Sequence, residues 1–148
     1  MFRSSFTDSE WQTILFTPLW AFTAVAGADR KVDDKETGAL AKELAEAMLY
    51  RDELTREVLS AVGLGLSTIM PAFAADARSI VAGLQEAGAI LDAKLPAGAA
   101  DGFKHATMLI AFNVAKASGS VFGDKTSKEE KAAIGLVAAA LRVPIPVG

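Results

Sequence analysis

Acidic side chains gather near residue 30 of the sequence, where they could hold a divalent cation. Asp29, Asp33, Asp34 and Glu36 lie within eight consecutive residues. Ca²⁺ takes about 6–8 oxygen ligands from carboxylates, carbonyls and water, and Mg²⁺ binds through carboxylates and retained water. The segment is not an EF-hand, because counting from Asp29 puts Asp34 where that loop needs glycine.

A second loop could complete such a site. If residues 118–130 lie beside the first loop, the two together supply the carboxylates of Asp29, Asp33, Glu36, Asp124 and Glu130 as ligands for Ca²⁺ or Mg²⁺. The alternative is that the acidic residues near position 33 only cap a helix, because carboxylates are favourable at the positive N-terminal end of the helix dipole. Both interpretations stay open from the sequence.

Catalytic patterns are weak. His105 is the only histidine, and it lies in an expected helix without an acidic or nucleophilic partner in register, whereas a general base needs a positioned partner. The segment 119–126 has an aspartate before its lysine and no preceding strand, unlike a P-loop. The sequence therefore predicts a protein that is not an enzyme. A hydrolase or transferase is the least supported alternative.

The composition excludes further classes. The 148 residues are 51% hydrophobic and 22% charged, which is typical of a folded domain. The absence of cysteine excludes disulfides, zinc–thiolate sites and cysteine nucleophiles. The net charge of −3 provides no basic field for nucleic acid. With no signal-peptide pattern after Met1, we expect a cytoplasmic protein.

The elements that would position these residues are helices. Alanine is abundant, prolines and aromatics are few, and no strand pattern is present, so the sequence predicts one all-α domain over residues 1–148, a bundle of six to seven helices. We expect an N-terminal arm over 1–6 and an extended tail over 142–148. Thr7 and Glu10 have capping-box spacing, and a helix is expected to follow them to about Gly27. Further helices are expected from Asp33, after Asp52, after Pro71 to about Lys94, from about Asp101, and after Ser127.

The helix that follows Asp33 has an apolar stripe at helical spacing. Leu40, Leu44 and Met48 recur every four residues, joined by Ala41 and Ala45. Such spacing predicts the face that packs against the core.

Two long uncharged stretches, residues 11–28 and 58–75, raise the question of membrane contact. A spanning helix needs roughly 20 mostly apolar residues. The second stretch contains Gly63, Gly65 and Pro71, which predict two helices with a break. Core helices are the favoured interpretation, and a membrane-contacting segment is the alternative.

Aromatic residues are the candidates for partner binding, because they dominate interface hot spots. Phe122 lies in a glycine-flanked loop, where exposure is expected. Trp11 and Trp20 are expected in the core, with exposed anchors as the alternative. The segment that contains Phe2 and Phe6 could instead dock onto another copy of the chain.

An internal repeat links the two candidate loops. Residues 25–32 align with 114–121, and Glu36 and Leu40 align with Glu130 and Ile134 after a longer second loop. Each half then consists of an apolar helix, a small polar turn and a capped helix. We expect two related helix–loop–helix halves that face each other across a pseudo-two-fold axis.

The runs at 24–36 and 114–119 resemble the tellurite-resistance TerB-like family, an all-helical fold with an acidic turn in each half. The resemblance covers mainly residues 19–49 and 108–141. It implies a metal-binding acidic cluster at Asp29, Glu36 and Glu130, and a protein of membrane-linked stress complexes. Arg30 and Ser118 depart from the family pattern, since they replace a turn glycine and the second turn aspartate.

We therefore predict a helical binding module with a protein partner or self-association, no nucleic acid, and a weak divalent-cation site. The alternative is a scaffold or oligomerisation domain without metal.

Overall fold

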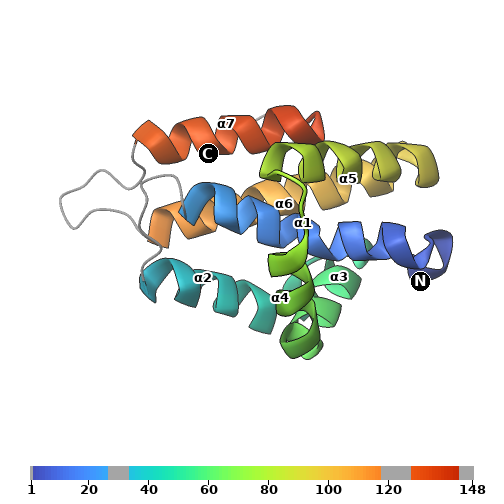
Figure 1. Ribbon diagram of the computed structural model, residues 1–148, viewed down its shortest axis with the longest axis horizontal. Coiled ribbons are helices and arrows are strands. Elements are labelled where there is room, and N and C mark those ends of the chain that lie inside the picture. The colour runs from blue at the N-terminus through green and yellow to red at the C-terminus, as the bar shows by residue number, and fades with distance from the viewer. Residues whose placement is uncertain (1, 27–33, 118–127, 144–148) are drawn as a thin grey trace.

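Seven α-helices and two short 3-10 helices make up most of the chain that the structure describes, and no strand is found among those residues. The structure is a computed structural model that describes residues 2–26, 34–117 and 128–143 (Figure 1). The predicted all-α bundle is confirmed. The elements are η1 Arg3–Ser5, α1 Asp8–Ala26, α2 Asp34–Ala45, η2 Ala47–Leu49, α3 Glu53–Leu64, α4 Leu66–Ala75, α5 Ile80–Lys94, α6 Ala97–Ala117 and α7 Lys128–Leu141.

Helix α1 is the centre of the bundle. It begins with the predicted capping box, in which the Glu10 amide donates to Thr7 Oγ1 at 3.1 Å and the Thr7 amide donates to Glu10 Oε1 at 2.9 Å. It continues through Pro18 to Ala26 and packs against α3, α5, α6 and α7. Burial on several sides explains why α1 is apolar around most of its circumference.

The helices of each predicted half pack against helices of the other half. Helix α1 packs on α6, while α2 lies against α6 and α7 lies against α1. In Figure 1, α2 and α7 flank the central pair on opposite sides, and the described ends of α1, α2, α6 and α7 meet at one end of the bundle. This is the contact pattern expected of two facing helix–loop–helix units. Their origin by duplication stays a prediction.

The predicted buried face of α2 is confirmed at Leu40 and Leu44, which pack against the core, and is wrong at its other positions. Met48 is 73% exposed and both Ala41 and Ala45 are exposed, while Leu40 and Leu44 are half-buried. The helix ends at Ala45, so the regular spacing stops before Met48, which instead lies in η2. A charged residue, Glu43, takes the buried position, and it is only 8% exposed.

Two expected helix starts also need correction. Pro71 does not precede a helix but lies inside α4, and the next helix begins at Ile80. Helix α6 begins at Ala97 rather than near Asp101, because the Pro96 carbonyl accepts hydrogen bonds from the Ala99 and Ala100 amides at 3.0 Å. A proline is tolerated at the start of a helix, where its missing N–H has no partner to lose.

The predicted burial of the tryptophans is confirmed. Trp20 is 2% exposed and Trp11 is 9% exposed. Phe6, from the expected N-terminal arm, is buried beside Trp11 with ring centroids 5.9 Å apart. The arm is fixed by Glu57, whose carboxylate accepts from the amides of Phe2 and Arg3 at 2.9 Å each.

Candidate functional site

Exposed large apolar residues gather at the junction of α3 with α4, where Met48, Leu64 and Leu66 form one apolar face, whereas the exposed Leu49 lies beside Leu109 in a separate hollow. Seven large hydrophobic side chains are exposed among the described residues, and five of them belong to η2, α3 and α4. These five are Met48, Leu49, Leu64, Leu66 and Met70. A contiguous exposed apolar patch often marks an interaction site, whereas single exposed apolar residues are ordinary on protein surfaces.

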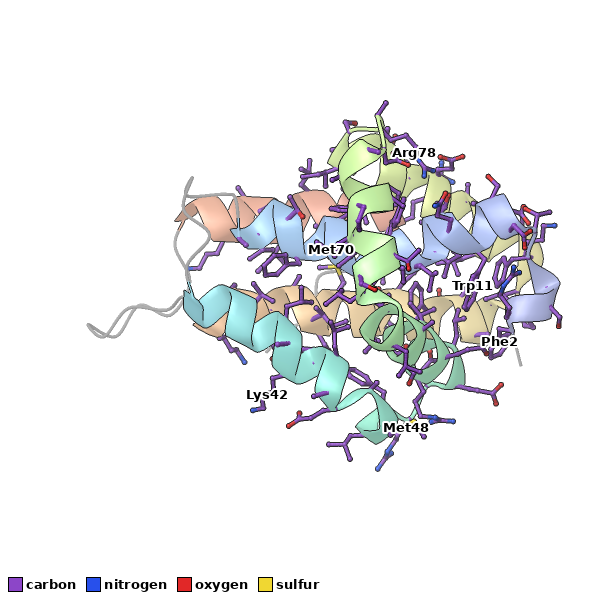
Figure 2. All side chains as sticks on the ribbon, turned by 60° about the horizontal axis from the view of Figure 1, so that its bottom comes forward. Phe2, Trp11, Lys42, Met48, Met70 and Arg78 are labelled. Carbon is purple, nitrogen blue, oxygen red and sulfur yellow. The ribbon has the colours of Figure 1, made fainter. Side chains whose placement is uncertain are left out.

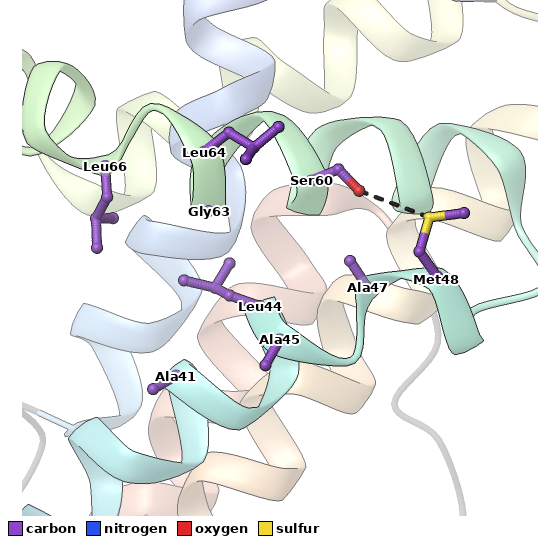
Figure 3. A pocket seen from close by; sticks show the side chains of 9 residues that line it. All are labelled: Ala41, Leu44, Ala45, Ala47, Met48, Ser60, Gly63, Leu64 and Leu66. Carbon is purple, nitrogen blue, oxygen red and sulfur yellow. Dashed lines mark hydrogen bonds between the residues drawn. The ribbon is translucent and has the colours of Figure 1, made fainter.

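This face is hollowed by a groove of about 490 Å³ between α2 and the junction of α3 with α4, hereafter the apolar groove (Figure 3). One wall comes from α2 and η2, through Ala41, Leu44, Ala45, Ala47 and Met48. The other comes from α3 and α4, through Ser60, Gly63, Leu64 and Leu66. The groove contains no charged side chain, and its volume lies within the range of ligand sites.

Small residues keep the groove open. Ala41 and Ala45 are one helical turn apart on α2, and Gly63 lies opposite on α3. A Cβ added to Gly63 would lie 3.9 Å from Leu44 Cβ, an ordinary contact distance, so the packing of α3 on α2 does not itself require glycine here. Because glycine has no side chain and alanine a short one, the backbone of a partner could approach the walls of the groove closely.

A sharp corner creates one end of the groove. Helices α3 and α4 meet at an angle of 93°, with Gly65 ending α3 and starting α4. A Cβ at Gly65 would lie 3.1 Å from the Ala61 carbonyl oxygen and 3.2 Å from Ile69 Cδ1, so any larger residue here would make these atoms shift by a few tenths of an ångström. The corner leaves Leu64 projecting with 90% of its surface exposed. The break predicted for the uncharged stretch 58–75 is thus confirmed.

Helix α4 crosses the front of the bundle and is anchored by one of its sides only (Figure 1). Phe73 makes an edge contact with Phe16 at a centroid distance of 5.3 Å and lies 6.0 Å from Trp20. None of its ten residues is fully buried, although none is charged. Its outer side, including Leu66 and Met70, therefore stays open to solvent (Figure 2).

A clamp around Arg78 fixes the end of α4. Its guanidinium pairs with Asp76 at 2.8 Å, donates to Thr13 Oγ1 at 2.9 Å, and contacts Glu86. It also lies over the Trp20 ring, 5.0 Å from the centroid. Hydrogen bonding from Arg78 lowers the pKa of the Asp76 carboxyl below its ordinary value. The clamp joins the α4–α5 connection to α1, which holds α4 in place.

A second, smaller hollow of about 270 Å³ lies between α2, η2 and α6. Glu43 accepts hydrogen bonds there from the Tyr50 hydroxyl and from Asn113 Nδ2. Burial, followed by the Glu43 carboxylate, raises the pKa of the Tyr50 phenol. Among the described ion pairs none includes Glu43, so neutral donors stabilise this carboxylate. The cluster fixes α2 and η2 to α6 and thereby sets one wall of the apolar groove.

Charges of both signs border the apolar groove. Beyond Met48 and Ser60 lies a polar hollow of about 460 Å³ lined by Glu53, Arg56 and Glu57. Ser60 Oγ lies 3.9 Å from Met48 Sδ at the boundary between the two hollows (Figure 3). Lys42 of α2 is also exposed, but it points away from α3 and α4 and lines neither hollow (Figure 2). The site is therefore an apolar centre with a mixed charged border.

The predicted metal site lies mostly outside the residues that the structure describes. Asp29, Asp33 and Asp124 fall in segments that are not described, as does the predicted partner-binding residue Phe122. Glu36 and Glu130 belong to the first turns of α2 and α7, whose ends lie at the same end of the bundle (Figure 1). Within the described ranges, no group of three or more acidic, histidine or cysteine side chains could hold a metal ion.

Two other sequence-based expectations concern α6 and the membrane. His105 is exposed on α6, as expected for a surface histidine. No single described helix is long and apolar enough to cross a membrane, and only the bent pair α3–α4 reaches the required length and composition together.

The apolar groove was not predicted. Its signals were the glycines and the uncharged stretch 58–75, both of which also fit a buried helix pair. The Glu43 cluster was not predicted either, since Asn113 is 70 residues away in the sequence.

Comparison with known proteins gives one relative. The chain is 29% identical over 147 residues to "Uncharacterized protein ORF11'" of Methanothermobacter thermautotrophicus, with 92% of this chain and 89% of that protein aligned. No protein-family model matches the chain. No solved structure matches it. The similarity runs along nearly the whole length of both chains.

Proposed function

We propose that this protein is a non-enzymatic helical binding module that docks a protein partner in the apolar groove between α2 and the α3–α4 corner. The observation that carries the proposal is the uncovered, uncharged helix α4 beside a groove with small residues along its walls. Apolar grooves bordered by polar residues accept the apolar face of an amphipathic helix. Leu64 and Met48 supply the flexible apolar contacts at the edges.

The wider setting of the proposal comes from the sequence. The resemblance of residues 19–49 and 108–141 to TerB-like proteins supports a place in a cytoplasmic stress assembly linked to a membrane. The same resemblance, with the acidic residues Asp29, Asp33, Glu36, Asp124 and Glu130 of the sequence, supports a weak Ca²⁺ or Mg²⁺ site. Docking in the apolar groove does not require that metal.

Site-specific photo-crosslinking tests the proposed docking. A photoreactive amino acid replaces Leu64, which is 90% exposed, in cells that express the protein. The matched control carries the same group at Leu136 on α7, which is 46% exposed. We expect discrete adducts from position 64 that disappear when Gly63→Leu fills the groove, and none from position 136. Equal labelling at both positions, or adducts that survive Gly63→Leu, would contradict the proposal.

A further inference from the structure

The apolar face carries a ridge and a hollow side by side. The ridge is the outer side of α4 with the Leu64 corner, and the hollow is the apolar groove, and Leu66 belongs to both. A surface that contains a projection and a complementary depression can bind its own copy through a two-fold axis, because each copy then fills the other. We propose that the occupant of the groove is a second copy of this chain, with α4 of each protomer in the groove of its partner. This inference rests on the proposed function.

The charge distribution favours self-association through this face rather than through other surfaces of the chain. Each chain has a net charge of −3, so two copies repel each other wherever acidic surfaces meet. Residues 58–75, which form most of α3 and all of α4, contain no charge. The polar hollow that adjoins the groove at Met48 and Ser60 carries Arg56 together with Glu53 and Glu57. A border with both signs can pair with itself, whereas a border of one sign would repel its copy.

The extent of the face fits a dimer. The ten residues of α4 and the nine groove residues share Leu66, and Ile69, Ala72 and Phe73 of α4 pack against the core, which leaves fifteen residues per protomer for an interface. With Glu53, Arg56 and Glu57 of the adjoining hollow the face has eighteen residues, just below the about 20–30 residues a side of a standard interface, which fits a weak, concentration-dependent dimer. Its centre is apolar and its border is polar, the arrangement of stable interfaces.

Sedimentation velocity across micromolar to millimolar protein concentrations tests the dimer. We expect a concentration-dependent dimer in the full-length wild type. Leu64→Glu should raise its dissociation constant by about tenfold or more, because the change places a carboxylate in the apolar centre. Gly63→Leu should have the same effect by filling the groove. The controls Leu136→Glu on α7 and Gly38→Leu on α2 should behave as wild type, since neither position lines the groove.

Crosslinking then tests the two-fold geometry. The chain has no cysteine, so a single introduced cysteine reports one contact. Leu66 joins ridge and hollow, so in the proposed arrangement it faces its own counterpart. Leu66→Cys should form an intermolecular disulfide under mild oxidation, and Leu136→Cys should not. Circular dichroism of each variant confirms that the helices are intact.

Two outcomes would overturn the inference. One is a monomer at all concentrations, and the other is a dimer that persists in both Leu64→Glu and Gly63→Leu. If the wild type is monomeric while the photo-crosslinker at position 64 still yields one discrete adduct with another protein, self-association fails and the docking function stands. If no adduct forms either, both proposals fail.

Discussion

Gly83 on α5 faces the indole of Trp20 on α1, and there is no room for a methyl group between them. A Cβ at residue 83 would lie 2.4 Å from Cε2 and Cζ2 of Trp20 and 2.7 Å from Cη2. The ring cannot retreat easily, because Phe16 contacts it edge-on at 5.5 Å and the Arg78 guanidinium lies 5.0 Å from its centroid. We expect Gly83→Ala to displace α5 from α1 and to destabilise the fold.

The magnitude follows from two opposing terms. Overpacking a filled core costs about 1–3 kcal/mol, and a rigid ring at 2.4 Å puts Gly83→Ala at the upper end, about 3 kcal/mol. Alanine in place of glycine inside a helix returns about 1 kcal/mol. The net loss of unfolding free energy is about 2 kcal/mol. For a domain of this size it lowers Tm by about 4–8 °C.

Guanidinium chloride unfolding followed by circular dichroism measures the loss. The matched control is Gly38→Ala on α2, where an added Cβ meets nothing within 4 Å, so the change should stabilise the protein by up to about 1 kcal/mol. In a Trp20→Phe background the Gly83→Ala penalty should shrink, because the six-membered part of the indole that the Cβ meets is gone. A Gly83→Ala variant as stable as the wild type would refute the reasoning.

Three other predictions concern the Arg78 clamp, the N-terminal segment and the candidate metal site. In the folded protein the pKa of Asp76 lies below its ordinary value of 3.8. Its pairing with Arg78 therefore stabilises the fold above that pH, and this stabilisation is lost as the pH falls through the folded pKa. Arg78→Met should make the urea midpoint depend less on pH in this acid range. Glu57→Gln removes one of two backbone acceptors and should cost about 1 kcal/mol, with faster hydrogen exchange at the first residues. Millimolar Ca²⁺ or Mg²⁺ should shift amide resonances of residues 29–36 and 118–130 together.

Each of these has a clear contrary result. An unchanged acid dependence in Arg78→Met, with Arg78→Lys as the charge-preserving control, would show that the pair does not govern Asp76. Hydrogen exchange at the N-terminal amides that is the same in Glu57→Gln and wild type would show that Glu57 does not hold this segment. Resonances that stay in place at millimolar metal would remove the cation site.

Local patterns predicted helix positions well. The Thr7–Glu10 capping box formed as expected, because all its partners lie within four residues. Asp52 likewise caps α3 by accepting from the Thr55 amide at 2.8 Å. The glycines near position 64 predicted the break between α3 and α4 for the same reason.

The burial of the two tryptophans was predicted correctly, but the burial of residues on and after α2 was not, because it depends on tertiary partners. Met48 had the right spacing for a core residue, but α2 ends three residues before it. Glu43 had the wrong chemistry for burial, and only the distant Asn113 and Tyr50 make that burial tolerable. The apolar groove could not be predicted from the sequence, because residues of similar chemistry differ completely in burial there. Val62 is 0% exposed and Leu64, two positions later, is 90% exposed.

The Tyr50 hydroxyl, which donates a hydrogen bond to Glu43, is also a built-in spectroscopic probe. Tyr50 is the only tyrosine of the sequence, so the ultraviolet signal of phenolate formation comes from one residue. That residue lies directly after η2, and its pKa is raised first by burial and then by the contact with Glu43 on α2, so losing that contact lowers the pKa towards its ordinary value. An alkaline absorbance titration therefore reports, without any label, whether α2 keeps its position when the neighbouring groove is filled.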